Sequence, residues 1–249
     1  MADLGILINT ELPQFDIDQL TTQRRFRTYL RVPAYVDKYL SRFGVPHDSQ
    51  GLKEILTLFY FWLKVVDDEI DQGKLDGRVI LERFGHASYE PTSKQLPIAL
   101  TDLLREGTLG RHDDVFTRLK ELYGAANMEK SAGNMRELIE ARKSLGRQVA
   151  LTTVELASPH IAFRNPAFEK FFVEIGEATN IYDLSLDWKE DFKNGNLNFR
   201  PSHRDALFLY ATAAGHLAKI LIKYPFIVTD SLKHMPYHTN NNILNNQHA

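Results

Sequence analysis

The stretch GLKEILTLFYFWLKVVDDEID, residues 51–71, decides the fold. Its apolar side chains recur every three or four residues, which is the repeat of an amphipathic helix. The run of about 20 residues is far longer than the usual strand of about 5 to 6 residues. Lys53, Glu54 and Lys64 also interrupt it, as charged residues do on a helix. The pattern therefore predicts a helix that is buried on most sides by its aromatic side chains.

The rest of the chain predicts further helices, separated by Pro, Gly and Asn. We expect them at residues 20–43, 75–86, 97–107, 112–124, 130–157, 166–192 and 202–223. No convincing run of alternating polar and apolar residues predicts a strand, and no internal repeat is found. The predicted fold class is all-α.

The composition is that of a globular protein, since 43% of the 249 residues are hydrophobic and 25% are charged. A chain of this length buries enough surface to form one large core, which can enclose a cavity. We expect a single domain over residues 1–236. Residues 237–249 are Asn-rich and poor in apolar side chains, so we expect a disordered tail there.

Charge and cysteine content exclude several classes of function. The net charge of -2 gives no basic field for nucleic acid. The absence of cysteine excludes disulfides, cysteine-ligated zinc and thiol nucleophiles. The first residues hold no apolar run long enough for a secretory signal or a membrane span. We expect a cytoplasmic protein without stable membrane insertion, and a homodimer stays open.

The first group of chemically active residues is VVDDEIDQ, residues 65–72, at the end of the aromatic-rich helix. Asp67 and Asp71 are four residues apart and share a helix face, and Asp68 lies three residues before Asp71. Such close carboxylates repel each other unless a cation neutralises them. The alternative is a solvated acidic face, the commoner origin of charge runs. Carboxylates at a helix C-terminus also face the negative end of its dipole, which favours the metal interpretation.

The second group is TNIYDLSLDWKEDFKNGNLNFRP, residues 179–201, in which Asp183, Asp187 and Asp191 recur every four residues. This spacing places three carboxylates along one stripe of a helix. Magnesium prefers oxygen ligands and is often held by one or two carboxylates, with phosphate oxygens and waters completing its shell. Two facing Asp-rich helices could hold several ions and a diphosphate between them.

These two segments resemble the Asp-rich motifs of the class I isoprenoid synthases, and within them the squalene and phytoene synthase branch. DDEID has both the DDxxD form of terpene cyclases and the DxxxD form of head-to-head synthases. The second segment is similar to one with an Asn, two Asp four residues apart, a basic residue, a Gly and a Pro. The likeness is close over the two segments and loose over residues 60–180.

Two departures separate this chain from the head-to-head branch. Asp183 stands where that branch usually has Asn, although Asn180 lies one turn earlier, and the Ser-Arg-Ser-Phe start of that branch is missing. The same stripe matches the second metal motif of terpene cyclases, in which an Asn or Asp is followed by further oxygen ligands at four-residue intervals. These departures favour a cyclase.

The resemblance implies a helical bundle around a central active-site cavity and a magnesium-dependent reaction, with up to three ions that Mn²⁺ could replace. The ions would draw charge onto the diphosphate until the C–O bond breaks and leaves an allylic cation. A linear prenyl diphosphate, with farnesyl diphosphate the first expectation, would become a cyclic terpene. The implied metal ligands are Asp67, Asp68, Asp71, Asp183, Asp187 and Asp191, among which Asp67, Asp71 and Asp187 are the expected catalytic residues.

Basic and apolar side chains complete the expected site. The candidates for binding the diphosphate are Arg142, Arg147, Lys193 and Arg200, for each of which surface charge is an equal alternative. The candidates for lining the apolar pocket are Phe59, Tyr60, Leu63, Phe172, Gly176 and Thr179, with core packing as the alternative for the aromatics. Gly146 either exposes a backbone carbonyl to the pocket or allows close helix packing.

Two other functions stay open. A head-to-head prenyltransferase would join two diphosphates and would need room for a second prenyl tail. A catalytically silent protein that binds metal or a prenyl lipid would keep the fold without turnover. The six acids in the two motifs argue against the silent protein, because mutually repelling residues are costly to keep without a function.

Overall fold

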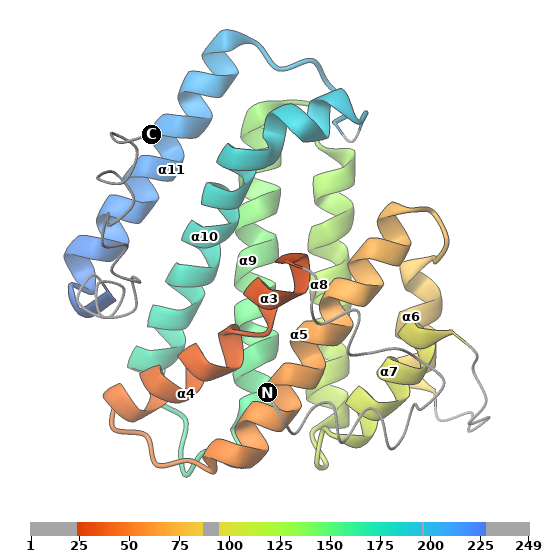
Figure 1. The fold of residues 1–249 in the computed structure, drawn as a ribbon, viewed down its shortest axis with the longest axis vertical. Coiled ribbons are helices and arrows are strands. Elements are labelled where there is room, and N and C mark those ends of the chain that lie inside the picture. The colour runs from red at the N-terminus through yellow and green to blue at the C-terminus, as the bar shows by residue number, and fades with distance from the viewer. Residues whose placement is uncertain (1–23, 87–94, 196, 228–249) are drawn as a thin grey trace, which may run out of the picture.

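The computed structural model of the chain describes residues 24–86, 95–195 and 197–227 (Figure 1). Its α-helices are α3 (Arg24–Tyr29), α4 (Val32–Arg42), α5 (Ser49–Asp71), α6 (Gly77–Gly85), α7 (Leu96–Glu106), α8 (His112–Ser131), α9 (Met135–Ala157), α10 (Pro166–Lys193) and α11 (His203–Lys223). A short 3-10 helix, Ser158–His160, follows α9. These residues form no strand, and one isolated antiparallel bridge joins His47 and Ile161. The predicted all-α class is confirmed.

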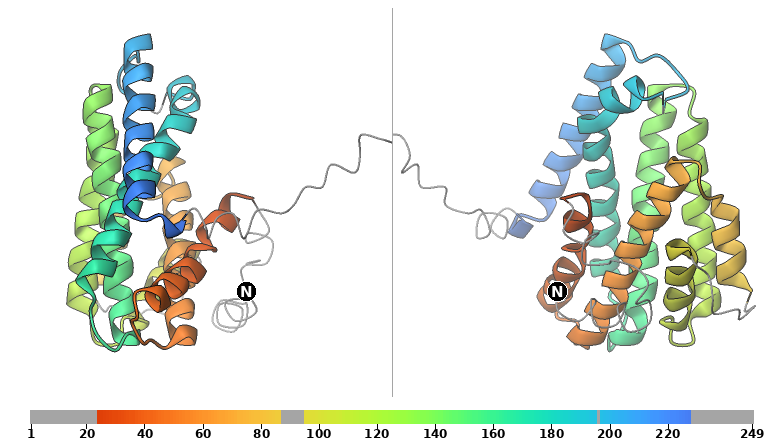
Figure 2. Two further views of the ribbon diagram at one scale, coloured as in Figure 1. Left: turned by 90° about the vertical axis from the view of Figure 1, so that its left-hand side faces the viewer. Right: turned by 45° about the vertical axis from the view of Figure 1, so that its right-hand side comes forward.

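The long helices form two layers (Figures 1 and 2). α8, α9, α10 and α11 stand side by side, and each runs antiparallel to the next. α5 lies across this row together with α3 and α4, and α6 and α7 flank it. This order brings the carboxyl ends of α5, α8 and α10 and the amino end of α9 to one end of the bundle, the upper end in Figure 1.

α5 supplies the centre of the hydrophobic core. Phe59 and Phe61 on this helix are completely buried, and the main cluster includes side chains from α3 to α11. The indole of Trp62 donates to the Thr101 hydroxyl at 2.8 Å, so its buried polar atom is satisfied. Asp48 caps the start of the helix, because its carboxylate accepts hydrogen bonds from two backbone N–H groups of the first turn. The expectation of a helix over residues 51–71 is confirmed.

The structure corrects two predicted boundaries. The helix expected over residues 20–43 is divided, because Pro33 in the first turn of α4 has no N–H with which to continue α3. Residues 20–23 lie outside the described ranges. α8 continues through Gly124 to Ser131, beyond the predicted end, and α9 starts only at Met135. Asn134 sets this start, because its side chain accepts a hydrogen bond from the Glu137 backbone N–H.

α11 has the length and apolar content that a membrane span requires, with a mean hydropathy of 1.3 over its most apolar window. A single helix of this kind is weak evidence for a span, since length and composition are all that it rests on. The absence of stable membrane insertion stays a prediction. The predicted tail at residues 237–249 lies outside the described residues.

Candidate metal and diphosphate site

The first Asp motif lies in the last two turns of α5, where a lysine holds two of its carboxylates. The Lys64 ammonium lies 2.7 Å from an Asp68 oxygen and 3.2 Å from an Asp67 oxygen. The Lys64 side chain is 15% exposed, whereas that of Asp67 is 51% exposed. Lys64 can pair with both Asp67 and Asp68 because residues three and four apart lie on the same face of a helix.

Charged side chains of α8 and α9 lie beside both Asp motifs. Lys130, at the end of α8, lies 3.5 Å from an Asp71 oxygen. Glu129, the preceding residue, accepts an ion pair from Arg142 of α9 at 2.7 Å. The same Arg142 nitrogen lies 3.8 Å from an Asp191 oxygen on α10. Arg142 therefore stands between a carboxylate of α8 and the end of the second Asp stripe.

The second Asp motif occupies the last three turns of α10, at the same end of the bundle as the first. Asp183 and Asp187 are exposed, and Asp191 is half-buried. Helix α10 begins at Asn165, whose side chain caps its first turn, and runs unbroken to Lys193. The predicted stripe of three carboxylates is therefore present on one continuous helix. Because α5, α8 and α10 all end here, their dipoles add negative potential to the acids.

Electrostatics links the two motifs. Burial raises the pKa of Glu129 above its ordinary value, the Arg142 charge opposes this shift, and Asp67, Asp191 and Asp71 raise the pKa further. Acids from α5 and from α10 therefore act on one carboxylate of α8. Carboxylates that repel each other in this way are stabilised either by taking up a proton or by binding a cation.

One acid of each motif has a raised pKa of its own. The surrounding protein partly desolvates Asp67, although half of its side chain is exposed, and this raises its pKa; Asp71 and Asp68 add to the shift and Lys64 opposes it. Asp183 is likewise exposed at its edge but partly desolvated, which raises its pKa, and the charge of Asp187 adds to the shift. The carboxylates are thus held in a setting that disfavours their negative charge. A bound cation would relieve that cost.

Tyr29, the last residue of α3, lies between the two motifs. Burial raises the pKa of its hydroxyl, and the charges of Asp67 and Asp183 raise it further. The Lys64 ammonium lies 5.9 Å from the centre of its ring. α3 lies between α5 and α10 in Figure 1, and its last residue, Tyr29, is near enough to both helices for an acid of each motif to act on its hydroxyl.

Arg142 carries a buried hydrogen-bond donor. Among the described residues no protein atom accepts a hydrogen bond from its Nε, although this atom is buried. A buried charged donor without an acceptor is costly, and an oxyanion is the natural ligand for a guanidinium. Of the four predicted diphosphate-binding residues, Arg142 is the one whose surroundings fit that role.

The other three predicted basic residues lie elsewhere. Arg147 forms an ion pair of 2.6 Å with Glu177, which joins α9 to α10. Lys193 ends α10, and Arg200 lies in the connection to α11, where both are exposed. Within the described residues, the acid that Arg147 holds is thus Glu177 of α10 and not a carboxylate of α5. Their predicted role in binding stays a prediction.

The acids do not form a preformed metal cage. Across residues 24–86, 95–195 and 197–227, no three His, Asp or Glu side chains are grouped closely enough to hold an ion. All six predicted ligands offer the hard oxygen atoms that magnesium prefers, and magnesium commonly keeps waters and uses only one or two carboxylates. The donor set therefore fits an open magnesium site that substrate oxygens would complete.

The predicted pocket residues fall into two groups. Phe59, Tyr60 and Phe172 are buried in the hydrophobic core, and the Tyr60 hydroxyl lies 2.8 Å from the Thr153 hydroxyl. Thr179 is exposed and donates its hydroxyl to the Ile175 carbonyl at 2.9 Å. Leu63 packs half-buried against the core. Core packing thus accounts for the three aromatic side chains.

Gly146 and Gly176 let α9 and α10 touch. A Cβ atom on Gly146 would collide with the Gly176 carbonyl, and a Cβ on Gly176 would lie 2.5 Å from the Gly146 carbonyl. α9 runs unbroken from Met135 to Ala157. Gly146 is therefore a packing glycine, and the alternative of a helix break that exposes a carbonyl is wrong.

A surface hollow of about 360 Å³ lies beside the first motif, where α5 turns into α6. Its lining residues are Ile70, Gly73, Lys74, Leu75, Asp76, Gly77, Tyr123, Asn127 and Lys130. None of the predicted pocket residues lines it. This hollow borders the site through Lys130, which contacts Asp71.

Three residues near the candidate site were not predicted from the sequence. Lys64 interrupts the apolar pattern of its helix, and its spacing of three and four residues from Asp67 and Asp68 is the signal in the sequence that could have identified it. Glu129 and Tyr29 reach the site through the packing of α8 and α3, which no local pattern reveals. Comparisons with protein-family models, with curated proteins and with solved structures give no match. The family resemblance therefore rests on the residues of the two Asp motifs.

Proposed function

We propose that this chain is a magnesium-dependent class I terpene synthase, which ionises one linear prenyl diphosphate and releases a cyclic terpene and diphosphate. The observation that carries the proposal is the shared field at one end of the bundle. The negative charges of Asp67 and Asp71 in the first motif and of Asp191 in the second all raise the pKa of Glu129 on α8. Two acidic motifs more than 100 residues apart in sequence thus act on one place.

The acids of the two motifs would hold the metal, Asp67 and Asp71 from α5 and the stripe of Asp183, Asp187 and Asp191 from α10. Bound magnesium would supply Lewis-acid stabilisation of the diphosphate leaving group. The raised pKa values of Asp67 and Asp183 support this assignment, because their surroundings disfavour negative charge in the absence of a cation.

Arg142 would bind the diphosphate itself. Its buried Nε would donate to a phosphate oxygen, and its ion pair with Glu129 fixes the guanidinium in place. A charge-assisted hydrogen bond that strengthens as the leaving group gains charge contributes to lowering the barrier. Tyr29 would shield the reacting end of the substrate from water, since this buried ring is near enough to both motifs for Asp67 and Asp183 to act on its hydroxyl.

A protein that binds a prenyl diphosphate without turnover is the second candidate. Lys64 neutralises both Asp67 and Asp68, and no group of three acids among the described residues forms a metal cage. These two observations favour a site in which a lysine takes the place of a metal ion. Such a protein would bind diphosphate without magnesium.

Turnover distinguishes the candidates. The purified chain is incubated with geranyl, farnesyl or geranylgeranyl diphosphate, with magnesium or with EDTA, and extracts are analysed by gas chromatography and mass spectrometry. We expect a cyclic product from one substrate, which is lost with EDTA and in Asp67→Asn and Asp183→Asn. A product with twice the carbon count would instead indicate a head-to-head prenyltransferase.

The matched control is Asp113→Asn, which removes an exposed acid from the first turn of α8, outside the site. This variant should keep full activity. An inactive parent that binds the diphosphates equally well in EDTA would contradict the synthase proposal and support the non-catalytic binding protein.

A further inference from the structure

The outward face of α11 is apolar, and in the described part of the chain its large side chains are exposed. Leu207 and Ile222 are 69% and 81% exposed, and Phe208 and Leu221 are 43% and 41% exposed. Only 17% of the most apolar window of this helix is buried. A helix with this much apolar surface is common in protein interfaces, and monomers rarely leave so continuous a stripe in water.

The residues of this face form five layers, spaced by 3.5 residues, along the helix. Large side chains form the first and last layers, Leu207 with Phe208 and Leu221 with Ile222. The three layers between them hold small residues, which are Ala211, Ala214 with Gly215, and Ala218. All four are exposed. The order large, small, small, small, large is the same in both directions, and its centre lies between Ala214 and Gly215.

A face that is symmetric about its own centre matches a second copy of itself turned end over end. In an antiparallel pair the large layer at Leu207 meets the large layer at Leu221 of the other copy, and the small layers meet at the centre. Small residues let two helices approach closely, while the large ones close the ends. We propose that this chain forms a two-fold symmetric dimer through antiparallel pairing of the α11 helices.

Charge supports the antiparallel direction. Arg204 lies in the first turn of α11, on the exposed side and at the positive end of its own helix dipole, where a cation is unfavourable. Antiparallel pairing places this arginine beside the negative carboxyl end of the other copy. Lys223 at that end is already neutralised by Glu174, at 2.5 Å. A parallel pair would instead bring two Arg204 side chains together.

The symmetry favours a second copy over the other possible occupants. A lipid surface requires an apolar face but no repeated order of large and small layers. A segment of the same chain would also cover the face without this symmetry. Only self-pairing requires that the two halves of α11 match each other.

Single cysteines test the pairing, since the chain has none of its own. Ala214→Cys lies at the two-fold axis, so two copies should form a disulfide under mild oxidation. Leu207→Cys lies about 22 Å along the helix from its own symmetry mate, at 1.5 Å per residue, and should not cross-link. Non-reducing gel electrophoresis gives both results. Equal cross-linking of the two variants would indicate a parallel pair and would overturn the proposal.

A steric variant tests the dimer without disturbing the monomer. A Cβ atom on Gly215 meets nothing within 4 Å, so Gly215→Arg fits the single chain but blocks close approach. Gly124→Arg is the matched control, because Gly124 of α8 is also open. In sedimentation or light scattering over a series of concentrations, we expect the full chain and Gly124→Arg to be dimers and Gly215→Arg to be a monomer. Unchanged circular dichroism checks the fold.

Two results would overturn the inference. One is that the unmodified chain stays monomeric at every concentration, and flotation with neutral phosphatidylcholine vesicles would then identify lipid as the occupant. The other is a dimer that Gly215→Arg leaves intact, which would place the interface on another surface.

Discussion

The carboxylates at the Asp-rich end oppose folding when they are charged. Partial desolvation by the surrounding protein raises the pKa of Asp67 and of Asp183, although both side chains are exposed at their edges, and neighbouring acids add to both shifts. A carboxyl whose pKa is higher in the folded chain binds more protons there than in the unfolded chain. The stability of the fold therefore falls as the pH rises from the unfolded value through the raised value. This cost of stability is consistent with carboxylates that serve to bind a cation.

Removal of one of these charges should stabilise the protein in the absence of metal. We predict that Asp183→Asn raises the melting temperature at pH 7 in EDTA, because the amide carries no charge in a setting that disfavours it. The gain should shrink as the pH falls toward and below 3.8, the ordinary value, because the carboxyl of the parent then takes up a proton as well. Thermal unfolding followed by circular dichroism over this pH range measures it.

The control for this prediction is Asp113→Asn, at an exposed helix start. It should not raise the melting temperature, because an acid in the first turn of a helix is favourable. An Asp183→Asn variant that melts at or below the parent at pH 7 would contradict the account.

A substitution of Lys64 tests the charge balance of the first Asp motif. Its ammonium pairs with Asp67 and Asp68, so Lys64→Met should remove this balancing charge and cost about 1 to 3 kcal/mol of stability. Magnesium should restore more stability to this variant than to the parent, because the ion then has no competing ammonium. Urea unfolding with and without magnesium measures both effects. Equal responses to magnesium would show that the ion does not bind beside Lys64.

Among the helices, the α9–α10 pair positions the second Asp motif. Gly146 and Gly176 bring the two backbones into contact, which fixes α10 against α9 below the acidic stripe. The Arg147–Glu177 ion pair lies at the same crossing. Close packing at this crossing thus sets where Asp183 and Asp187 stand relative to α5.

A methyl group at the crossing should separate the helices. Gly146→Ala should destabilise the fold by about 1 to 3 kcal/mol, despite the better helix propensity of alanine, because the added atom collides with backbone rather than with a movable side chain. Gly124→Ala, in an open part of α8, should be neutral or stabilising by up to about 1 kcal/mol. Urea unfolding compares the two. Equal effects would mean that α9 and α10 do not touch at Gly146.

Helix positions followed from the sequence where apolar repeats and caps agree, as they do for α5, α10 and α11. The predicted helix boundaries were wrong where a residue can either end a helix or lie inside one. Pro33 lies inside a continuous apolar pattern and still divides α3 from α4. Gly124 resembles a helix end but lies on an open face, where a glycine costs little enough for α8 to continue.

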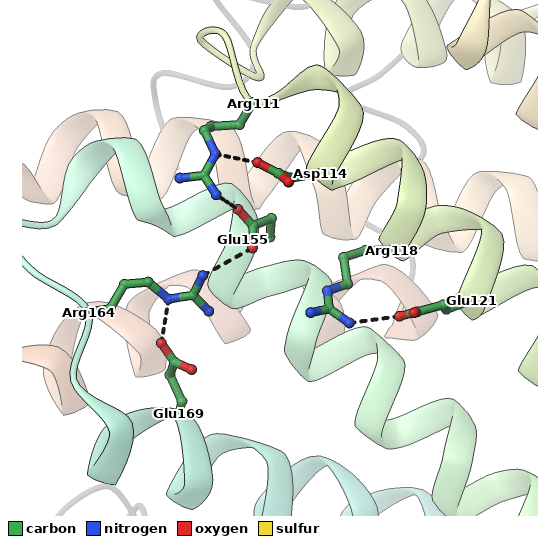
Figure 3. Close-up of polar contacts among 7 residues, drawn as sticks. All are labelled: Arg111, Asp114, Arg118, Glu121, Glu155, Arg164 and Glu169. Carbon is green, nitrogen blue, oxygen red and sulfur yellow. Dashed lines mark hydrogen bonds and ion pairs between the residues drawn. The ribbon is translucent and has the colours of Figure 1, made fainter.

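For the molecule as a whole, the end opposite the Asp motifs is held by a network of ion pairs (Figure 3). Glu155, at the end of α9, is 5% exposed and binds Arg111 before α8 and Arg164 before α10. Arg164 also pairs with Glu169 at 2.7 Å. A single buried carboxylate thus joins the chain connections that set the order of α8, α9 and α10.

Neutralisation of this carboxylate should loosen the bundle. We predict that Glu155→Gln costs about 2 kcal/mol of stability, because two arginines lose their shared buried partner. The control is Glu121→Gln, which breaks an exposed pair with Arg118 in the same view and should cost less than about 1 kcal/mol. Chemical unfolding measures both values. A Glu155→Gln variant as stable as Glu121→Gln would show that the network adds nothing to the fold.

The candidate site was only partly accessible from the sequence. Spacing alone places the acids of each motif on one helix face, and the structure brings the two helices to one end of the bundle. The antiparallel order of the helices, which causes this meeting, depends on packing between distant segments. For the same reason Glu129, Tyr29 and the buried Nε of Arg142 emerge only from the folded chain.

The central claim is that the two Asp motifs form one site for magnesium and diphosphate. Its most direct test is calorimetric titration of the full chain with inorganic diphosphate, in magnesium and in EDTA, together with Asp67→Asn, Asp183→Asn, Arg142→Met and the control Asp113→Asn. We expect magnesium-dependent binding that is lost in each of the three site variants and kept in the control. Binding that survives the loss of either motif, or that needs no magnesium, would contradict the claim.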